Sequence, residues 1–322
     1  MKTLKILALV LASVMMLTMF VGCDVADDGK YQVGICQLTE HVALDAATQG
    51  FKDALVEALG EENVEFNYQS AQGDSNTCST ICNQFVSDGV DLILANATPA
   101  LQAAAAATNE IPVLGTSVTE YGVALEIENF DGTVGGNISG TSDLAPLDKQ
   151  ADMITEWFPN AKKVALLYCS AEANSKYQVD EVKKYLEAKD IEATLYSFSD
   201  SNDISAVCTN AANENDVIYV PTDNAVADNT GIIDNICRPM KKPVIAGEEG
   251  ICNGCGVATL SISYYDLGKT TGEMAAKILR GEADIADMKI EYTEVTKKYN
   301  ADICEALGIT PVEGYVAIEA AE

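Results

Sequence analysis

The chain has 322 residues, 48% of them apolar, and its 49 acidic and 20 basic residues give a formal charge of −29. A chain of this length predicts two lobes rather than a single core. The negative charge argues against nucleic acid as a partner, because such a surface repels a phosphate backbone.

The N-terminus is predicted to be a signal peptide (residues 1–22) followed by a lipidated tether (residues 23–30). Lys2 and Lys5 precede an apolar run, and small residues stand directly before Cys23. This arrangement is typical of exported bacterial proteins and resembles a lipobox. In that interpretation Cys23 is lipidated, becomes the first mature residue, and holds an extracytoplasmic protein to the cell membrane. An ordinary cleaved signal and a membrane anchor are the alternatives, although the run is short for a spanning helix.

The first half of the chain alternates strands with helices. Short apolar runs bounded by turn residues predict the strands, and apolar residues at helical spacing predict the helices. The expected strands are residues 31–38, 64–68, 91–95 and 111–115, and the expected helices are 43–59, 75–88 and 99–108. The run at 91–95 is almost wholly apolar, which is typical of a parallel strand buried on both faces.

The same pattern restarts in the second half and is followed by a different tail. The expected strands are residues 163–169, 191–198, 217–220 and 243–246, with helices at 174–189, 203–214 and 225–237, then a helix at 265–280, a strand at 290–295 and a helix at 301–307. Two similar halves predict an α/β fold of two Rossmann-like lobes with parallel sheets. Because the tail must return to one lobe or the other, we expect a hinge with several crossovers. The expected division is 31–142 plus 260–287 for the N-lobe and 143–259 plus 288–322 for the C-lobe.

The ten cysteines allow three interpretations. Cys252 and Cys255 form the single CxxC motif, and an exported protein could oxidise them to a disulfide. A structural zinc site needs four converging ligands, which one CxxC and one histidine do not supply. Other cysteines lie within apolar patterns, where a thiol behaves as a small hydrophobic group. Free thiols are therefore favoured, with the disulfide as the main alternative.

Polar loops follow six of the predicted strands, where open parallel sheets bind ligands. These loops are residues 39–41, 96–98, 116–119, 170–175, 221–224 and 247–250. Taken singly, each is most simply explained as a helix N-cap. If the lobes face each other, all six border one cleft. Their hydroxyls, amides, helix N-termini and carboxylates would then suit a zwitterionic ligand.

The sequence supports a catalytic function less well than ligand binding. Glu40 and His41, the only histidine, could form an acid–base pair, but no activated-nucleophile motif accompanies them. Neither a GxGxxG nor a GxxxxGK[ST] motif follows a strand, so no nucleotide cofactor is expected. A lone histidine also makes a metal site improbable.

Seven segments in order resemble one known family. They are GICQLTEHVALDAATQGFKDAL, LILANATPALQAAAAAT, IPVLGTSVT, LLYCSAEANS, VPTDNAV, VIAGEEG and SISYYDLGKTTGEMAAKILRGE. The chain is similar to the extracellular solute-binding proteins of ABC transporters related to the tryptophan/tyrosine-binding group. The resemblance implies the type I periplasmic-binding-protein fold, no catalysis, and closure of two lobes on a small-molecule ligand. It also implies delivery of that ligand, an amino acid that could be aromatic, to a permease driven by a separate ATPase.

The resemblance also places ligand contacts in the polar loops. The implied contact residues are Thr39, Glu40, His41, Asn96, Thr98, Ser117, Thr119, Asn174, Ser175, Thr222, Asp223 and Glu248. Asn174 and Ser175 open a helix and are assigned to a ligand carboxylate, whereas Asp223 and Glu248 are assigned to an α-amino group. Two alternatives stay open: the ligand-binding part of a sensor that acts through a separate receptor, and an exported enzyme that uses Glu40 and His41.

Overall fold

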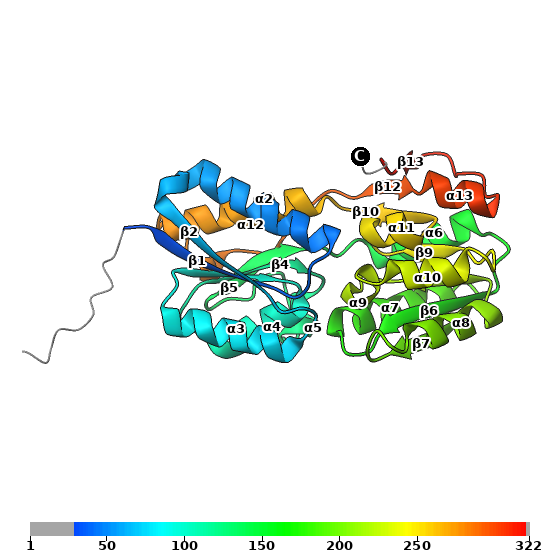
Figure 1. Cartoon of the computed structure of the whole chain (residues 1–322), viewed down its shortest axis with the longest axis horizontal. Helices are drawn as coiled ribbons and strands as arrows, with labels where there is room; N and C mark the ends of the chain where they lie inside the picture. The colour runs from blue at the N-terminus through cyan, green and yellow to red at the C-terminus, as the bar shows by residue number, and fades with distance from the viewer. Residues whose placement is uncertain (1–28, 320–322) are drawn as a thin grey trace, which may run out of the picture. The chain divides into compact units, whose positions relative to one another are not determined.

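The computed structural model describes residues 29–319, and the chain from Tyr31 onward forms one compact unit (Figure 1). The predicted signal peptide and Cys23 lie outside the described residues. Within the described range, no helix combines the length and the apolar character needed to cross a membrane.

The N-lobe is built on a parallel sheet of six strands in the order β11-β5-β4-β3-β1-β2. The strands are β1 (Tyr31–Gln37), β2 (Val64–Ser70), β3 (Leu92–Asn96), β4 (Val113–Val118), β5 (Ile138–Ser142) and β11 (Glu291–Tyr292). The helices are α2 (Val42–Leu59), α3 (Ser75–Asp88), α4 (Thr98–Ala107), α5 (Tyr121–Ala124) and α12 (Tyr264–Leu279), with short 3₁₀ turns η1 (Glu61–Asn63) and η2 (Ile285–Asp287). Helices α2 and α12 pack side by side on one face, and α3 and α4 cover the other (Figure 1).

The strand sequences explain this three-layered arrangement. Along β3, Leu92 and Leu94 face the core under α2 and α12, whereas Ile93 and Ala95 face the core under α3 and α4. Successive side chains on a strand point to opposite faces, so a strand between two helical layers must be apolar throughout. The continuous apolar run therefore fixes β3 at the centre of the lobe.

The C-lobe has a seven-stranded sheet in the order β13-β12-β10-β9-β8-β6-β7. The strands are β6 (Lys163–Cys169), β7 (Glu192–Phe198), β8 (Val217–Val220), β9 (Val244–Ala246), β10 (Ala258–Ser261), β12 (Thr296–Tyr299) and β13 (Val316–Ala317). The helices are α6 (Leu147–Trp157), α7 (Ala173–Glu187), α8 (Ile204–Glu214), α9 (Asn224–Ala227), α10 (Thr230–Cys237), α11 (Glu249–Cys255) and α13 (Ala301–Leu307). All neighbouring strands are parallel except β10 and β12, which run antiparallel.

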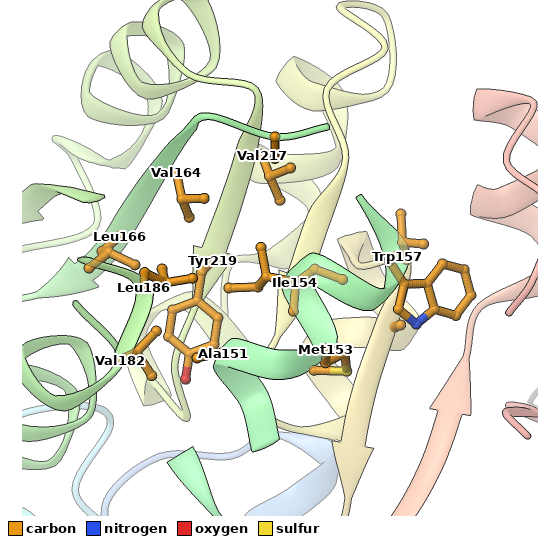
Figure 2. Close-up of a cluster of buried hydrophobic side chains, with 14 of the residues drawn as sticks. Ala151, Met153, Ile154, Trp157, Val164, Leu166, Val182, Leu186, Val217 and Tyr219 are labelled. Carbon is orange, nitrogen blue, oxygen red and sulfur yellow. The ribbon is translucent and has the colours of Figure 1, made fainter. Parts of the chain in front are cut away.

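One C-lobe core lies between the sheet and helices α6 and α7 (Figure 2). Tyr219 of β8 is fully buried there, with Val182, Leu186 and Ala151 around its ring. Its hydroxyl donates a hydrogen bond to the Gln150 side chain, so the one polar atom of this large side chain is satisfied inside the core.

The sequence predicts a hinge with several crossovers, and three crossovers connect the lobes. They run from β5 to α6, from β10 to α12, and from β11 to β12. The boundaries of the last two differ from the predicted division. β10 pairs with β9 in the C-lobe sheet and ends at Ser261, and β11 pairs with β5 in the N-lobe sheet. The last crossover therefore follows Tyr292 rather than residue 287. The two-residue β11 carries too little apolar pattern to reveal which sheet it joins.

Helices α2 and α12 approach each other closely because each places a glycine against the backbone of the other. A Cβ atom added to Gly268 would lie 1.9 Å from the Ala47 carbonyl oxygen, and one added to Gly50 would lie 2.0 Å from the Tyr265 carbonyl oxygen. Only glycine fits at such a backbone contact. This packing anchors the start of α12, and with it the second crossover, to the N-lobe.

All nine cysteines of the described residues are buried free thiols, including Cys252 and Cys255. Those two lie in α11 and pack into the C-lobe core. Within residues 29–319 no group of histidine, cysteine or acidic side chains could hold a metal ion.

Candidate functional site

A small cavity lies where the strand ends of the two lobes face each other. The volume that it leaves for a water-sized molecule is about 10 Å³. Its lining residues are His41, Leu44, Ser117, Thr119, Asp143, Asn174, Thr222, Asp223, Asn224, Ala227, Glu248 and Tyr264. Seven of the twelve predicted contact residues are among them: His41, Ser117, Thr119, Asn174, Thr222, Asp223 and Glu248.

His41 reaches from one lobe to the other. It occupies the N-cap position of α2, but its side chain makes no capping hydrogen bond. Its Nε2 instead lies 3.3 Å from Oδ1 of Asn224, at the start of α9 in the C-lobe. Burial lowers the pKa of the imidazole, so the ring is neutral at pH 7 and can donate one hydrogen bond across the cleft.

Asp223 and Glu248 form the acidic C-lobe wall, and both are helix caps. Asp223 accepts from the backbone N–H groups of Cys169 (2.6 Å) and Val226 (2.9 Å), one at each carboxylate oxygen. Glu248 accepts from the N–H groups of Gly250 and Ile251. Burial raises the pKa of each carboxyl to about 7, with the neighbouring Glu172 adding to the rise at Asp223.

Asp143 was not among the predicted contact residues, yet it is buried in the cavity wall with only 4% of its surface exposed. The Tyr264 hydroxyl donates to its Oδ2 at 3.0 Å, while Oδ1 has no partner with hydrogen-bond geometry. Burial raises the pKa of this carboxyl to about 6, although the Tyr264 and Thr119 hydroxyls favour its ionised form. It follows directly on β5, a strand that the sequence analysis does not predict; recognising that strand would have added its loop to the site.

Asn174 presents an acceptor to the cavity. Its amide nitrogen lies within hydrogen-bonding distance of the Glu172 carboxylate (3.2 Å) and the Thr222 carbonyl (3.0 Å). These acceptors hold the amide nitrogen on their side, and the buried Oδ1 has no partner. The side chain therefore suits an ammonium, and not the carboxylate to which the sequence analysis assigns it.

Ser117 lies on the N-lobe side in a strained backbone conformation. Its φ of 54° is in the left-handed region, next to a register shift in the β4–β5 pairing. A serine there is unfavourable by about 1 kcal/mol or more, and such strain concentrates at functional sites. Ser117 lines the cavity, and its buried Oγ has no hydrogen-bond partner among the described residues.

The other five predicted residues do not line the cavity: Thr39, Glu40, Asn96, Thr98 and Ser175. Thr39 lines a neighbouring outer pocket. Asn96 is structural, since its amide donates to the Leu44 carbonyl (2.8 Å) and the Thr48 hydroxyl (2.9 Å). Buried Thr98 opens α4, and buried Ser175 is hydrogen-bonded within the C-lobe wall.

Glu40 is exposed on the surface, and the hydrogen-bonding partner of His41 is Asn224. The two residues of the proposed acid–base pair therefore do not form a catalytic unit. Neither lysine nor arginine is among the described residues that line the cavity. Three buried carboxyls without a basic neighbour favour a ligand with a positive charge.

Residues 32–322 match the family model described as ABC transporter substrate binding protein. A curated tyrosine-binding protein of Clostridioides difficile (strain R20291) is 36% identical over 326 residues, which cover 95% of this chain and 93% of that protein. The crystal structure of an ABC domain from Streptococcus pneumonia in complex with L-Trp is 31% identical. It matches with a TM-score of 0.84 over 89% of this chain and 99% of that one.

A third relative helps to describe the position of the lobes. The ligand-free, open structure of a substrate-binding protein with adhesive properties from Clostridium difficile is 37% identical over 90% of this chain and 100% of that one, with a TM-score of only 0.69. The higher identity thus accompanies the poorer superposition. In the present structure the lobes touch across the cleft through the contact between His41 and Asn224.

Proposed function

Because the chain belongs to the family of ABC transporter substrate-binding proteins, we propose that its interlobe cavity captures one free L-amino acid of the aromatic class and presents it to a membrane permease. Members of this family bind substrates and do not transform them, so the chain is not an enzyme. Substrate-binding proteins of ABC importers act outside the cytoplasm, which is also where the predicted signal would send this chain.

The observation that carries the proposal is the set of unpartnered acceptors in the cavity. Ser117, Asp143 and Asn174 line the same small space, and each has a buried side-chain oxygen (Oγ, Oδ1 and Oδ1) without a hydrogen-bond partner among the described residues. A buried polar group without a partner costs about 1–3 kcal/mol. An α-ammonium group brings three N–H donors and a positive charge, and would satisfy all three acceptors at once.

The ligand carboxylate would lie against the N-lobe wall. The α2 helix begins there without a side-chain cap, at His41, so its first backbone N–H groups stay available to an anion. The Thr119 hydroxyl lies on the same side. The opposite wall is acidic and would repel a carboxylate, so the two walls orient a zwitterion.

The aromatic class is supported by the relatives and by the apolar part of the lining. The curated relative is a tyrosine-binding protein, and the solved relative is a complex with L-Trp. Leu44, Ala227 and the Tyr264 ring provide apolar wall around the cavity. Such a wall favours an aromatic side chain through burial of its ring.

Lipidation of Cys23 and delivery to a permease with a separate ATPase complete the proposal. The residues before Cys23 have the character of a lipoprotein signal. One lipid and a polar tether would keep the lobes beside the membrane, where captured ligand reaches its permease. Mass spectrometry of the mature protein from its own host would test this, because lipidation requires a diacylglyceryl group on Cys23.

A thermal-shift screen of the twenty L-amino acids tests the binding proposal. A ligand that binds only the folded protein stabilises it in proportion to ln(1 + [L]/Kd). We expect tyrosine or tryptophan to raise the melting temperature most, and native mass spectrometry of protein purified without refolding should detect the same compound. No response to any amino acid would reject the amino-acid ligand.

A further inference from the structure

We propose that Asp143 is the charged residue that binds the ligand's ammonium group, and that its hydrogen bond to Tyr264 ties this contact to the hinge. The inference rests on the proposed function, because it assumes an amino-acid ligand. It assigns the central electrostatic contact to a residue that lies between the lobes.

The hydrogen bonds of the three cavity carboxyls favour Asp143 over the other two. Asp223 and Glu248 each accept two backbone N–H groups, one per oxygen, so their oxygens already have donors. Asp143 accepts from the Tyr264 hydroxyl at Oδ2, and the nearby Thr119 hydroxyl also favours its ionised form, but neither carboxylate oxygen accepts a backbone N–H group and Oδ1 is buried without a partner of hydrogen-bond geometry. A cation that enters the cavity should therefore gain the most binding free energy at Asp143, because a desolvated carboxylate oxygen there lacks a hydrogen bond.

The three unpartnered acceptors come from three different parts of the fold. Ser117 is the penultimate residue of β4 in the N-lobe, Asn174 is the second residue of α7 in the C-lobe, and Asp143 lies in the first crossover between them. An ammonium group has three N–H bonds and so can join one acceptor from each part. Ammonium binding would then hold both lobes and the hinge in the closed arrangement.

Tyr264 connects this contact to a second crossover. It is the first residue of α12, directly after the segment that leaves β10, and only 7% of its surface is exposed. Its hydroxyl bonds to Oδ2 of Asp143 at 3.0 Å, so one carboxylate joins two of the three hinge segments. Tyr264 is thus a positioning residue that fixes how Asp143 faces the cavity.

The test compares two ligands and two variants by calorimetric titration. The ligands are L-tyrosine and 3-(4-hydroxyphenyl)propanoic acid, which has the same skeleton without the amino group. The variants are Asp143→Asn and, as matched control, Asp148→Asn, which removes the same charge from the exposed first turn of α6. We expect Asp143→Asn to weaken L-tyrosine binding by about 10- to 100-fold and to leave the deamino compound within about threefold. Asp148→Asn should change neither affinity by more than about twofold.

Each other outcome is decisive. A folded Asp143→Asn protein that keeps its L-tyrosine affinity, or loses both ligands equally, overturns the assignment but leaves the proposed function standing. If the wild-type protein binds neither L-tyrosine nor L-tryptophan, the proposed function and this inference both fail. Should Asp143→Asn not fold, Asp143→Glu retains the charge on a longer side chain, and we expect it to keep a reduced preference for the amino group.

Tyr264→Phe tests the positioning role separately. It should keep the preference for L-tyrosine over the deamino compound but reduce ligand-induced compaction, measured as the change in radius of gyration by small-angle X-ray scattering. Unchanged compaction would show that Tyr264 does not couple the ligand to the hinge.

Discussion

On the C-lobe side of the cavity, the carboxylates that follow the strands are hydrogen-bonded to helix N-termini. On the N-lobe side, α2 and α4 begin without side-chain caps, although Asp74 caps α3 and Glu120 caps α5. Asp223 and Glu172 accept backbone N–H groups at the start of α9, and Glu248 does so at the start of α11. The N-caps of α2 and α4 are His41 and Ala97, and neither makes a side-chain capping bond.

Because of this difference, we expect the C-lobe wall to contribute mainly to the stability of the protein and the N-lobe wall mainly to its affinity for the ligand. A capping carboxylate stabilises its own lobe whether or not a ligand is present. An uncapped helix and an unpartnered hydroxyl gain their partners only when a ligand arrives. Substitutions in the C-lobe wall should therefore lower the free energy of unfolding, and substitutions in the N-lobe wall should mainly lower affinity.

Asp223→Ala should have the largest effect. It leaves the buried N–H groups of Cys169 and Val226 without acceptors. Each unpaired N–H group lowers the free energy of unfolding by about 1–3 kcal/mol. We expect the free energy of unfolding, measured by denaturant titration, to fall by about 2–5 kcal/mol. Asp203→Ala is the control, because Asp203 also occupies an N-cap position but is exposed and makes no capping bond. A similar loss in both variants would contradict the proposed difference between the walls.

The next effect is a pH dependence of the ligand-free protein. Burial raises the pKa of Asp223 and Glu248 to about 7, above the ordinary values of about 4 in an unfolded chain. Between these limits the folded protein binds more protons than the unfolded chain, so stability should fall as the pH rises from about 4 to 7. His41, whose pKa is lowered by burial, acts in the opposite direction, and Asp143 adds to the fall up to about pH 6. We expect a melting temperature several degrees higher at pH 5 than at pH 8.

Glu248→Gln checks the cause of that dependence. The amide cannot ionise but keeps the shape of the side chain, so the slope of melting temperature against pH should become shallower. An amino-acid ligand should also reduce the slope, because its ammonium group favours the ionised carboxyls. An unaltered slope in Glu248→Gln would exclude this residue as a source.

A smaller effect is expected at the contact between the two walls. His41→Ala and Asn224→Ala each remove one side of the 3.3 Å contact, and we expect each to weaken ligand binding by about 2- to 10-fold without unfolding either lobe. The double variant should lose little more than the single variants, because the two residues act as a pair. Fully additive losses in a double-mutant cycle would mean that the contact does not contribute to the ligand-bound state.

The sequence predicts the two-lobed α/β fold, and the structure confirms it, because buried parallel strands and amphipathic helices have strong local patterns. Strands β3 and β8 are examples, since nearly every side chain in them must be apolar. The polar loops at the strand ends could also be located from the sequence. Seven of the predicted residues line the cavity for that reason.

Local pattern could not show what each polar side chain does. Asn96 is the last residue of β3 and Asn174 lies in the first turn of the helix after β6, but the first is held in a buried network and the second lines the cavity. Asp143 escaped prediction because β5, with the sequence Ile138–Ser142, contains more small and polar residues than a typical buried strand. Its role depends on contacts between segments far apart in the sequence, such as the bond from Tyr264.

The smallest expected effect is at Ser117, where two substitutions distinguish backbone strain from the contribution of the hydroxyl to ligand binding. Glycine adopts a φ of 54° without steric cost, so Ser117→Gly should relieve strain that Ser117→Ala retains. Both variants lose the unpartnered hydroxyl and should weaken binding of L-tyrosine by the same factor, about 2- to 10-fold. Ser117→Gly should be more stable than Ser117→Ala by about 0.5–1 kcal/mol in thermal unfolding without ligand. If instead the two variants differ in affinity and not in stability, the backbone conformation itself contributes to ligand binding, and the N-lobe wall recognises its ligand by more than hydrogen bonding.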